Sequence, residues 1–303
     1  MNRRQILAGA TTAALFTGAC ATSGVAPTPP DAGFASDRFG VLVEGTGPDV
    51  IFIPGLTSHP EIWDATVAHL AGRYRTHRLH LSGFAGRPAG GNAEGLVSTP
   101  VADEIARYIR ETGLDRPALI GHSMGGAIGL MLAARHPDLV GRLMVVDMLP
   151  FMGVMFGPPG TTADSVRPVA DQVRDGMRAA TPEQWAASSA QSIAGMINTE
   201  ALRAGPMRHG ATSDQDVAAR AMHELITTDL RPELPNITAP TEVLYVAFNA
   251  QGMTPELTDT IYQLSFAGLE GVELTRIDDS AHFIMFDQPA RFHAEVDAFL
   301  AAR

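Results

Sequence analysis

The sequence predicts an α/β fold in which a mostly parallel sheet carries helices on both faces and is interrupted by an inserted helical segment. Three observations predict it. Short apolar runs of strand type alternate with segments whose apolar residues recur at helical spacing. One of these runs leads through a tight glycine-flanked turn at 121–125 straight into a helical pattern. From about Leu149 to Leu234, only helical patterns occur. Right-handed crossovers between the alternating elements would make most strand pairs parallel.

The composition is that of a globular protein with one large core. The chain has 303 residues, of which 45% are hydrophobic and 18% are charged. A formal net charge of −11 argues against nucleic acid as a partner, because nucleic-acid binding needs clustered cations. All 22 basic residues are arginine, which excludes a lysine Schiff base and a P-loop lysine. The ten histidines and the single cysteine show no metal-ligand spacing, so we expect no metal.

Residues 1–25 have the pattern of an export signal. Arg3 and Arg4, followed by Gln-Ile-Leu, resemble a twin-arginine signal, and the mildly apolar stretch behind them is too short for a permanent membrane anchor. Cleavage after Ala21 and lipidation of Cys20 are two alternative endings, and an unprocessed cytoplasmic N-terminus is the third reading. We therefore expect an exported bacterial protein, either periplasmic or anchored as a lipoprotein. The sequence makes no prediction of the oligomeric state.

Residues 26–38 form a proline-rich linker, and residues 39–148 form the first part of the core. The elements expected in this part are a weak strand at 41–43, a buried strand at 49–53, a helix at 63–70, a strand at 79–81 and a helix at 101–109 closed by Gly113.

The stretch from 117 to 134 predicts a nucleophile elbow. The apolar run 117–120 stops at Gly-His-Ser-Met-Gly (121–125), and a helix of small residues follows. Such a turn lifts the hydroxyl of Ser123 clear of the sheet at the start of a helix. Two backbone N–H groups could stabilise an oxyanion there, that of Met124 and that of Leu56 in the loop after strand 49–53.

After a strand at 143–146 that ends at Asp147, residues 149–235 are predicted to form an inserted helical lid. A Thr-Pro-Glu-Gln capping box at 181–184 starts one of its helices, and Ser213 is expected to cap another. Phe151 and Met155 lie at the start of the insertion. They fit either an adaptable apolar wall for an acyl chain or a packed hinge.

Residues 236–303 complete the core. We expect a strand at 242–248, a helix opened by Thr254-Pro255, a strand at 272–277 and a closing helix around 292–300. His282, in the loop after the last strand, is the expected general base, since this topology returns it to the sheet edge that carries Ser123. His122, inside the elbow, is expected to pack beneath the nucleophile.

These features together resemble the α/β-hydrolase superfamily. The residues that carry the resemblance are Pro-Gly-Leu at 54–56, Gly-His-Ser-Met-Gly-Gly at 121–126, the helical insertion and Asp-Asp-Ser-Ala-His at 278–282. The resemblance covers residues 39–303. It implies a mostly parallel eight-stranded sheet, a Ser–His–acid triad, hydrolysis of esters or related acyl compounds, and no cofactor.

The acid of the implied triad is left open by the sequence. The family usually places it after the penultimate strand, where this chain has Asn249, an amide that can orient an imidazole but carries no charge. Asp147 is the alternative, because some members take the acid from the end of the strand that follows the elbow helix. Glu256 and Asp279 are further candidates.

The favoured hypothesis is a serine hydrolase that cleaves a small-molecule carboxylic ester or lactone through an acyl-enzyme on Ser123. Asn249 motivates the alternative of a weak or inactive hydrolase-fold protein that only binds. Carbon–carbon bond hydrolysis and perhydrolysis stay open as well, since the same triad serves them.

Overall fold

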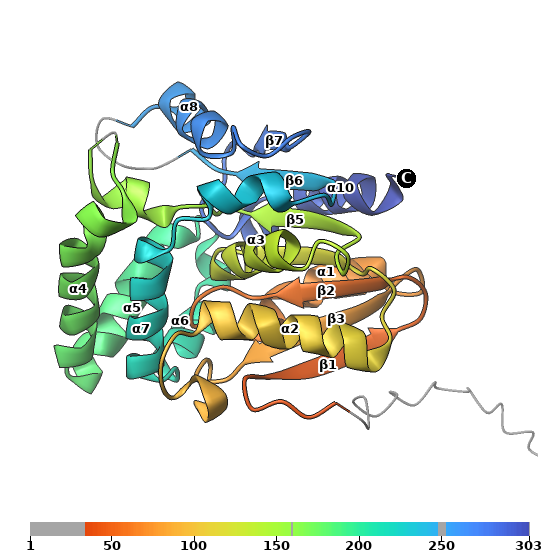
Figure 1. Ribbon diagram of the computed structural model, residues 1–303. Coiled ribbons are helices and arrows are strands. Elements are labelled where there is room, and N and C mark those ends of the chain that lie inside the picture. Colours follow the sequence, from red (N-terminus) through yellow and green to blue (C-terminus); the bar gives the residue numbers. More distant parts are fainter. Residues whose placement is uncertain (1–33, 159, 248–252, 303) are drawn as a thin grey trace, which may run out of the picture.

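A computed structural model describes residues 34–158, 160–247 and 253–302, and it shows one sheet with helices packed on both faces (Figure 1). The sheet has seven strands in the order β1-β3-β2-β4-β5-β6-β7. They are β1 (Phe39–Gly45), β2 (Asp49–Ile53), β3 (Arg75–Leu81), β4 (Ala118–His122), β5 (Arg142–Val146), β6 (Thr241–Tyr245) and β7 (Glu273–Arg276). β1 runs antiparallel to β3, and all other neighbours pair in parallel, as predicted.

The sheet of the described residues has seven strands, which corrects the eight strands that the resemblance implied. The seven strands of the described residues come from the short apolar runs seen in the sequence. β1 forms the sheet edge, with Phe39 paired to Leu81, and residues 34–38 before it contain one large apolar side chain and form no strand. An additional edge strand would need a further run of this kind, and the described residues offer none.

Helices cover both faces of the sheet. The α-helices are α1 (Asp64–Leu70), α2 (Ser98–Thr112), α3 (Met124–Arg135), α4 (Ala163–Ala179), α5 (Pro182–Met196), α6 (Ala204–Ala211), α7 (Gln215–Thr227), α8 (Pro255–Ser265), α9 (Ile284–Asp287) and α10 (Pro289–Ala301). Short 3-10 helices are η1 (Pro60–Trp63), η2 (Gly90–Asn92), η3 (Met152–Phe156), η4 (Glu200–Leu202) and η5 (Arg231–Asn236). Within the described ranges, no helix combines the length and the apolar character needed to cross a membrane.

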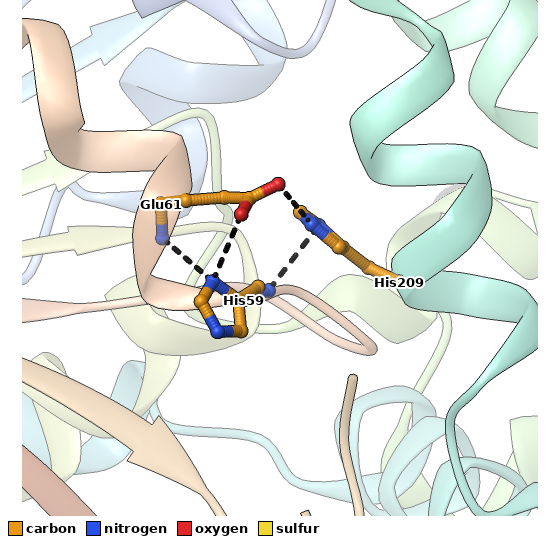
Figure 2. Close-up of side chains that lie close together, drawn as sticks. All are labelled: His59, Glu61 and His209. Atoms are coloured by element: carbon orange, nitrogen blue, oxygen red, sulfur yellow. Dashed lines mark hydrogen bonds and ion pairs between the residues drawn. The ribbon is translucent and has the colours of Figure 1, made fainter. Parts of the chain in front are cut away.

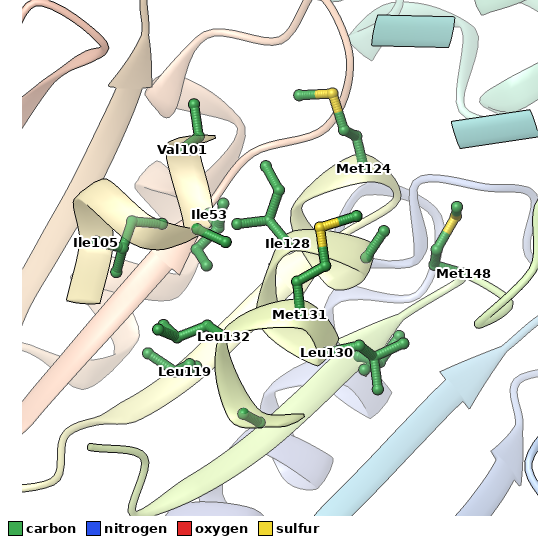
Figure 3. Packing of buried hydrophobic residues seen from close by; sticks show 14 of the residues in the cluster. Ile53, Val101, Ile105, Leu119, Met124, Ile128, Leu130, Met131, Leu132 and Met148 are labelled. Carbon is green, nitrogen blue, oxygen red and sulfur yellow. The ribbon is translucent and has the colours of Figure 1, made fainter. Parts of the chain in front are cut away.

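Alternation along the strands divides the core into two layers. In β2, Ile51 and Ile53 pack with α2, α3 and α8, whereas Val50 and Phe52 pack with α1 and α10 on the opposite face. Figure 3 shows the first layer, in which the apolar side chains of α3 lie against those of α2 and the sheet. Burial on both faces explains why these strands are almost entirely apolar.

Between β5 and β6, the described residues contain α4 to α7 and no strand, as the sequence predicted. We call this part the helical insertion. α4 packs with α7 and α5 packs with α6, and Figure 1 shows the four helices grouped beside one end of the sheet. The predicted capping box is confirmed, because Thr181 Oγ1 accepts the N–H of Gln184 (3.3 Å) while Gln184 Oε1 accepts the N–H of Thr181 (2.9 Å).

Two details of the insertion differ from the prediction. α6 was not expected, since this short segment has no apolar stripe. α7 is capped by Asp214, whose carboxylate accepts the N–H of Val217 at 3.0 Å, and not by Ser213. The hydroxyl of Ser213 is already engaged, because it donates to the carbonyl of His209 (2.8 Å) and accepts the N–H of Ala85 (2.9 Å).

Candidate active site

Ser123 occupies the turn between β4 and α3 in a strained conformation. Its φ of 54° and ψ of −123° lie where residues with a side chain are rarely found. A Cβ atom at Gly121 would clash with the carbonyl of Gly125, and one at Gly125 would clash with the carbonyl of Ile53, so the turn requires both glycines. The N–H of Ser123 donates to the carbonyl of Val146 at 2.8 Å. The strand, turn and helix predicted for 117–134 are confirmed.

His282 and Asp147 meet although they are 135 residues apart in the chain. Nδ1 of His282 lies 2.6 Å from Oδ2 of Asp147, and Asp147 is 8% exposed. Asp147 immediately follows β5, and His282 lies in the loop between β7 and α9. Since the carboxyl ends of parallel strands meet at one edge of the sheet, both side chains arrive beside Ser123, and all three line one cavity.

The second carboxylate oxygen of Asp147 is fixed by two donors. Oδ1 accepts the N–H of Val246 (3.2 Å) and the hydroxyl of Tyr262 (3.1 Å). Burial, together with the neighbouring Asp147 charge, raises the pKa of Tyr262 well above its ordinary value, so its hydroxyl stays a donor. Tyr262 was not predicted, because its place on α8 carries no signal beyond helical periodicity.

The structure brings one of the four acid candidates to His282. In the described part of the chain, Asp147 is the carboxylate that hydrogen-bonds the imidazole. Glu256 lies exposed at the start of α8, and Asp279 is exposed in the loop before His282, and neither contacts the ring. Asn249 lies outside the described residues.

His122 packs beneath the elbow, as predicted. Its ring is 1% exposed and contacts the rings of His282 and Phe283. Burial is the largest cause that lowers the pKa of His122 well below its usual value, so the ring is neutral. Its Nε2 lies 3.0 Å from the carbonyl of His282 and therefore donates to it. The contact fixes the backbone that carries His282.

Asp287 ties the His282 loop to the segment that follows α5 in the helical insertion. Its carboxylate accepts three backbone N–H groups, from Asn198 (3.0 Å), Thr199 (2.8 Å) and Ala281 (2.9 Å). Burial would raise the pKa of Asp287, but these N–H donors outweigh it and lower the pKa below its ordinary value. These hydrogen bonds hold the residues after α5 against the loop before His282. No sequence signal pointed to this role.

The two predicted oxyanion donors lie at the elbow. The N–H of Met124 is the first of α3, and Leu56 lies in the loop after β2. A Cβ at Gly55 would stand 3.1 Å from the Cβ of Ser123, which shows how closely this loop approaches the serine. Neither N–H donates to an acceptor in the described residues. Both are therefore available to an oxygen bound next to Ser123.

The cavity has a volume of about 730 Å³, within the usual size range of small-molecule sites. Sheet-edge loops form its floor, and the helical insertion forms its opposite wall. Six methionines line it, namely Met148, Met152, Met155, Met177, Met196 and Met222. Among the described lining residues, Asp147, His122 and His282 are the acidic and basic side chains. Three serines of α5, Ser188, Ser189 and Ser192, are among the remaining polar groups.

Of the two residues considered as substrate contacts, Met155 and Phe151, one lines the cavity and the other does not. Met155 lines the cavity and is 39% exposed. Phe151 does not line it. Its ring is fully buried with Val166 and Ala170 of α4 and Ile226 of α7. The prediction that Phe151 contacts the substrate is therefore corrected, and the residue belongs to the packed hinge that the sequence also allowed. A pattern of apolar residues cannot tell which of two neighbouring spaces each side chain fills.

Three side chains from distant segments form a second polar cluster, shown in Figure 2. Nitrogen and oxygen atoms of His59, Glu61 and His209 lie within 4.8 Å of one another. His59 Nδ1 accepts the N–H of Glu61 (3.1 Å), and His209 Nε2 lies 2.6 Å from Glu61 Oε1. Because the nitrogens that face the carboxylate are already hydrogen-bonded, the cluster fits a hydrogen-bonded network better than a metal centre. No sequence pattern indicated this cluster, because His209 lies 150 residues from His59 along the chain.

The fold and the site define a class of protein. A sequence model described as the alpha/beta hydrolase fold matches residues 48–289, and the chain belongs to this family. It is a hydrolase of the α/β fold.

Individual relatives are esterases and a lactonase. The chain is 25% identical over 260 residues to a pimeloyl-[acyl-carrier protein] methyl ester esterase of Edwardsiella ictaluri, covering 84% of this chain and 94% of that protein. It is 35% identical over 107 residues to the corresponding esterase of Aeromonas hydrophila, covering 35% of this chain and 40% of that one. The enol-lactonase structure from Burkholderia xenovorans LB400 superposes with a TM-score of 0.70 at 20% identity, covering 87% of this chain and 96% of the other.

Proposed function

We propose that the protein is a serine hydrolase that cleaves uncharged carboxylic esters or lactones through an acyl-enzyme on Ser123. The observation that carries the proposal is the 2.6 Å contact between His282 and Asp147 in a cavity that Ser123 also lines. The similarity to a methyl ester esterase and the structural likeness to an enol-lactonase support the same class of substrate.

The proposed reaction has two acyl-transfer steps. Ser123 Oγ attacks the carbonyl carbon while Nε2 of His282 takes its proton, and the N–H groups of Leu56 and Met124 stabilise the oxyanion. The imidazolium then protonates the leaving alkoxide, and the C–O bond breaks. In the second step, Nε2 of His282 takes a proton from water while the water oxygen attacks the acyl-enzyme. The imidazolium then protonates Oγ of Ser123 as the acyl–oxygen bond breaks and the acid leaves. Asp147 keeps the proton on Nδ1 of His282 and stabilises the imidazolium.

The cavity wall supports an uncharged, largely apolar substrate. Methionines are flexible and adapt to acyl chains of different shape. No arginine lines the cavity within the described residues, so nothing there would pair with a carboxylate on the substrate. We propose that the helical insertion acts as the cover of this site, because Met177 of α4 and Trp185 of α5 line the same cavity as Ser123.

The binding-only alternative depended on Asn249 as the triad partner. Since Asp147 provides a carboxylate to His282, Asn249→Asp should change the turnover less than about threefold. A large gain in activity would favour the binding-only alternative. Carbon–carbon bond hydrolysis and perhydrolysis use the same groups, and product analysis with a diketone and with peroxide distinguishes them from ester hydrolysis.

The test is turnover of p-nitrophenyl acetate, butyrate and octanoate by the purified protein. Ser123→Ala and His282→Ala should each lower kcat/KM roughly 10⁴-fold. Ser98→Ala is a matched control, because this buried hydroxyl lies on α2 without a hydrogen-bond partner. An alkyl fluorophosphonate should phosphonylate Ser123 with loss of HF, so the wild type should gain the mass of the reagent minus HF and Ser123→Ala should not. Absence of turnover with every ester and lactone, or full activity of Ser123→Ala, would contradict the proposal.

We also propose that residues 1–25 direct export and that Cys20 is the residue to test for lipid attachment. Cell fractionation of the full chain, with Arg3 and Arg4 changed to Lys as a twin-arginine control, tests the first point. Labelling with a fatty-acid analogue, lost in Cys20→Ala, tests the second.

A further inference from the structure

The helical insertion is attached to the loop that carries Leu56. We call residues 55–59 the Leu56 loop. Nδ1 of His209, on α6, lies 3.4 Å from the backbone nitrogen of His59, at the end of this loop. Nε2 of the same ring lies 2.6 Å from Oε1 of Glu61, which begins the next turn (Figure 2). One imidazole therefore holds two points of the segment that follows β2.

The partners of His209 define its protonation state. A backbone N–H can only donate, so Nδ1 of His209 must accept and carries no proton. An ionised carboxylate can only accept, so Nε2 must carry the proton. Both contacts are satisfied together in one form, the neutral ring protonated on Nε2. A second proton would sit on Nδ1 and face the N–H of His59, and that hydrogen bond would be lost.

The surroundings favour this neutral form. His209 is 4% exposed, and burial lowers its pKa despite the opposing effect of Glu61. Burial would raise the pKa of Glu61, but its contacts with His209, His59 and Arg208 outweigh that effect and lower it. His80, whose ring lies 4.7 Å from that of His59, has its pKa lowered to about 4, mainly by burial. Glu61 is therefore ionised while His209 and His80 are neutral near pH 7.

We propose that His209 is a positioning residue, which as a neutral imidazole clamps the Leu56 loop to α6 and so fixes the direction of the Leu56 N–H. The inference rests on the proposed function, because it assigns the Leu56 N–H to the oxyanion. Two further hydrogen bonds hold α6 and the turn that follows it in place within the insertion. Trp185 Nε1 donates to the carbonyl of Gly210 (3.1 Å), and Ser213 is bonded to the carbonyl of His209 (2.8 Å). α6 is thus a fixed support for the loop.

Two substitutions separate the two contacts of His209. In His209→Asn, the amide oxygen takes the place of Nδ1 and still accepts the N–H of His59, but the side chain no longer reaches Glu61. In His209→Gln, the amide reaches Glu61 and leaves the N–H of His59 without its acceptor. We expect kcat for p-nitrophenyl butyrate to fall about tenfold or more in His209→Gln, with KM nearly unchanged, and to fall less than about threefold in His209→Asn.

Hydrogen–deuterium exchange of the Leu56 loop gives a readout that needs no activity. At pH 7, exchange at residues 55–59 should be faster in His209→Gln than in the wild type and in His209→Asn. In the wild type it should rise, after correction for intrinsic rates, as the pH falls below 6.5, the ordinary pKa of histidine, because protonation of His209 removes its acceptor. This wild-type comparison stands even where a variant does not fold.

His223→Gln is the matched control. His223 also lies in the insertion, on α7, and its Nε2 is 3.0 Å from Asp171, but it touches neither the Leu56 loop nor the cavity. It should leave both kcat and exchange unchanged. Wild-type exchange and kcat in His209→Gln would overturn the inference. Faster exchange in a protein that hydrolyses no ester would leave the clamp in place and refute the proposed function.

Discussion

Asp147→Asn tests the triad most directly, because the structure determines how the amide must lie. Two donors, the N–H of Val246 and the hydroxyl of Tyr262, point at Oδ1. The amide oxygen has to occupy that position, so the NH₂ group replaces Oδ2 and faces Nδ1 of His282. Nδ1 must then accept, and the ring proton moves to Nε2, the nitrogen that should receive the proton of Ser123.

The expected loss has two sources. The wrong tautomer of His282 cannot act as the base, and the carboxylate charge that stabilises the imidazolium is gone. The equivalent amide substitution in the serine-protease triad lowers kcat about 10⁴-fold, which corresponds to about 5.4 kcal/mol of barrier. Asp147 makes the same kind of contact at 2.6 Å in a buried site, so we expect a loss of similar size.

The assay is kcat/KM for p-nitrophenyl butyrate, with circular dichroism and thermal unfolding to verify the fold. Asp259→Asn is the matched control, since this carboxylate also accepts a tyrosine hydroxyl, that of Tyr245 at 2.8 Å, but lies outside the cavity. It should keep its activity. A folded Asp147→Asn enzyme within tenfold of the wild type would refute the assignment of Asp147 as the triad acid.

Three further predictions concern stability. Burial, with Glu295 and Glu273 nearby, raises the pKa of Glu242 on β6 to about 7, so the folded protein binds the proton more tightly than the unfolded chain and loses stability as pH rises from about 4.5 to 7. Glu242→Gln should therefore raise the Tm by roughly 2–4 °C at pH 8 and hardly change it at pH 4.5. Gly125→Ala should lower the free energy of unfolding by about 3 kcal/mol in urea denaturation, because its Cβ would clash with a strand carbonyl; an unchanged midpoint would refute the packing of the turn. Asp287→Asn should lower it by about 2 kcal/mol at pH 7 and by less at about pH 2, since the lowered pKa of this carboxylate gives stability that is lost as the pH falls below the ordinary value of 3.8; equal losses at both pH values would argue against a charged acceptor.

Features encoded by local patterns could be predicted from the sequence. β2, the turn at Ser123 and the capping box at 181–184 follow from neighbouring residues alone, and all three appear where the sequence puts them. His282 could be placed near Ser123 because parallel strands deliver their following loops to one edge.

Features that depend on distant partners could not be predicted. The choice between Asp147 and the other acids rests on how the ends of β5, β6 and β7 align, which no single segment contains. For Phe151 the sequence left the cavity wall and a packed hinge open, because hydrophobicity alone does not distinguish the cavity from burial against α4 and α7. His209 belongs to α6, a short helix without an apolar stripe, and its partners lie 148 and 150 residues away.

The helical insertion is attached to the sheet-edge loops at two places, so some of its parts can be substituted with less effect on those loops than others. α6 is joined to the loop after β2 through His209, and the end of α5 is joined to the His282 loop through Asp287. Before both attachments in the chain, α4 and the first turns of α5 line the cavity, and the hydrogen bonds to the two loops come from later residues of the insertion. For the hydrolase proposed above, exchanging this first portion of the insertion would change the wall of the cavity and leave the reactive groups undisturbed.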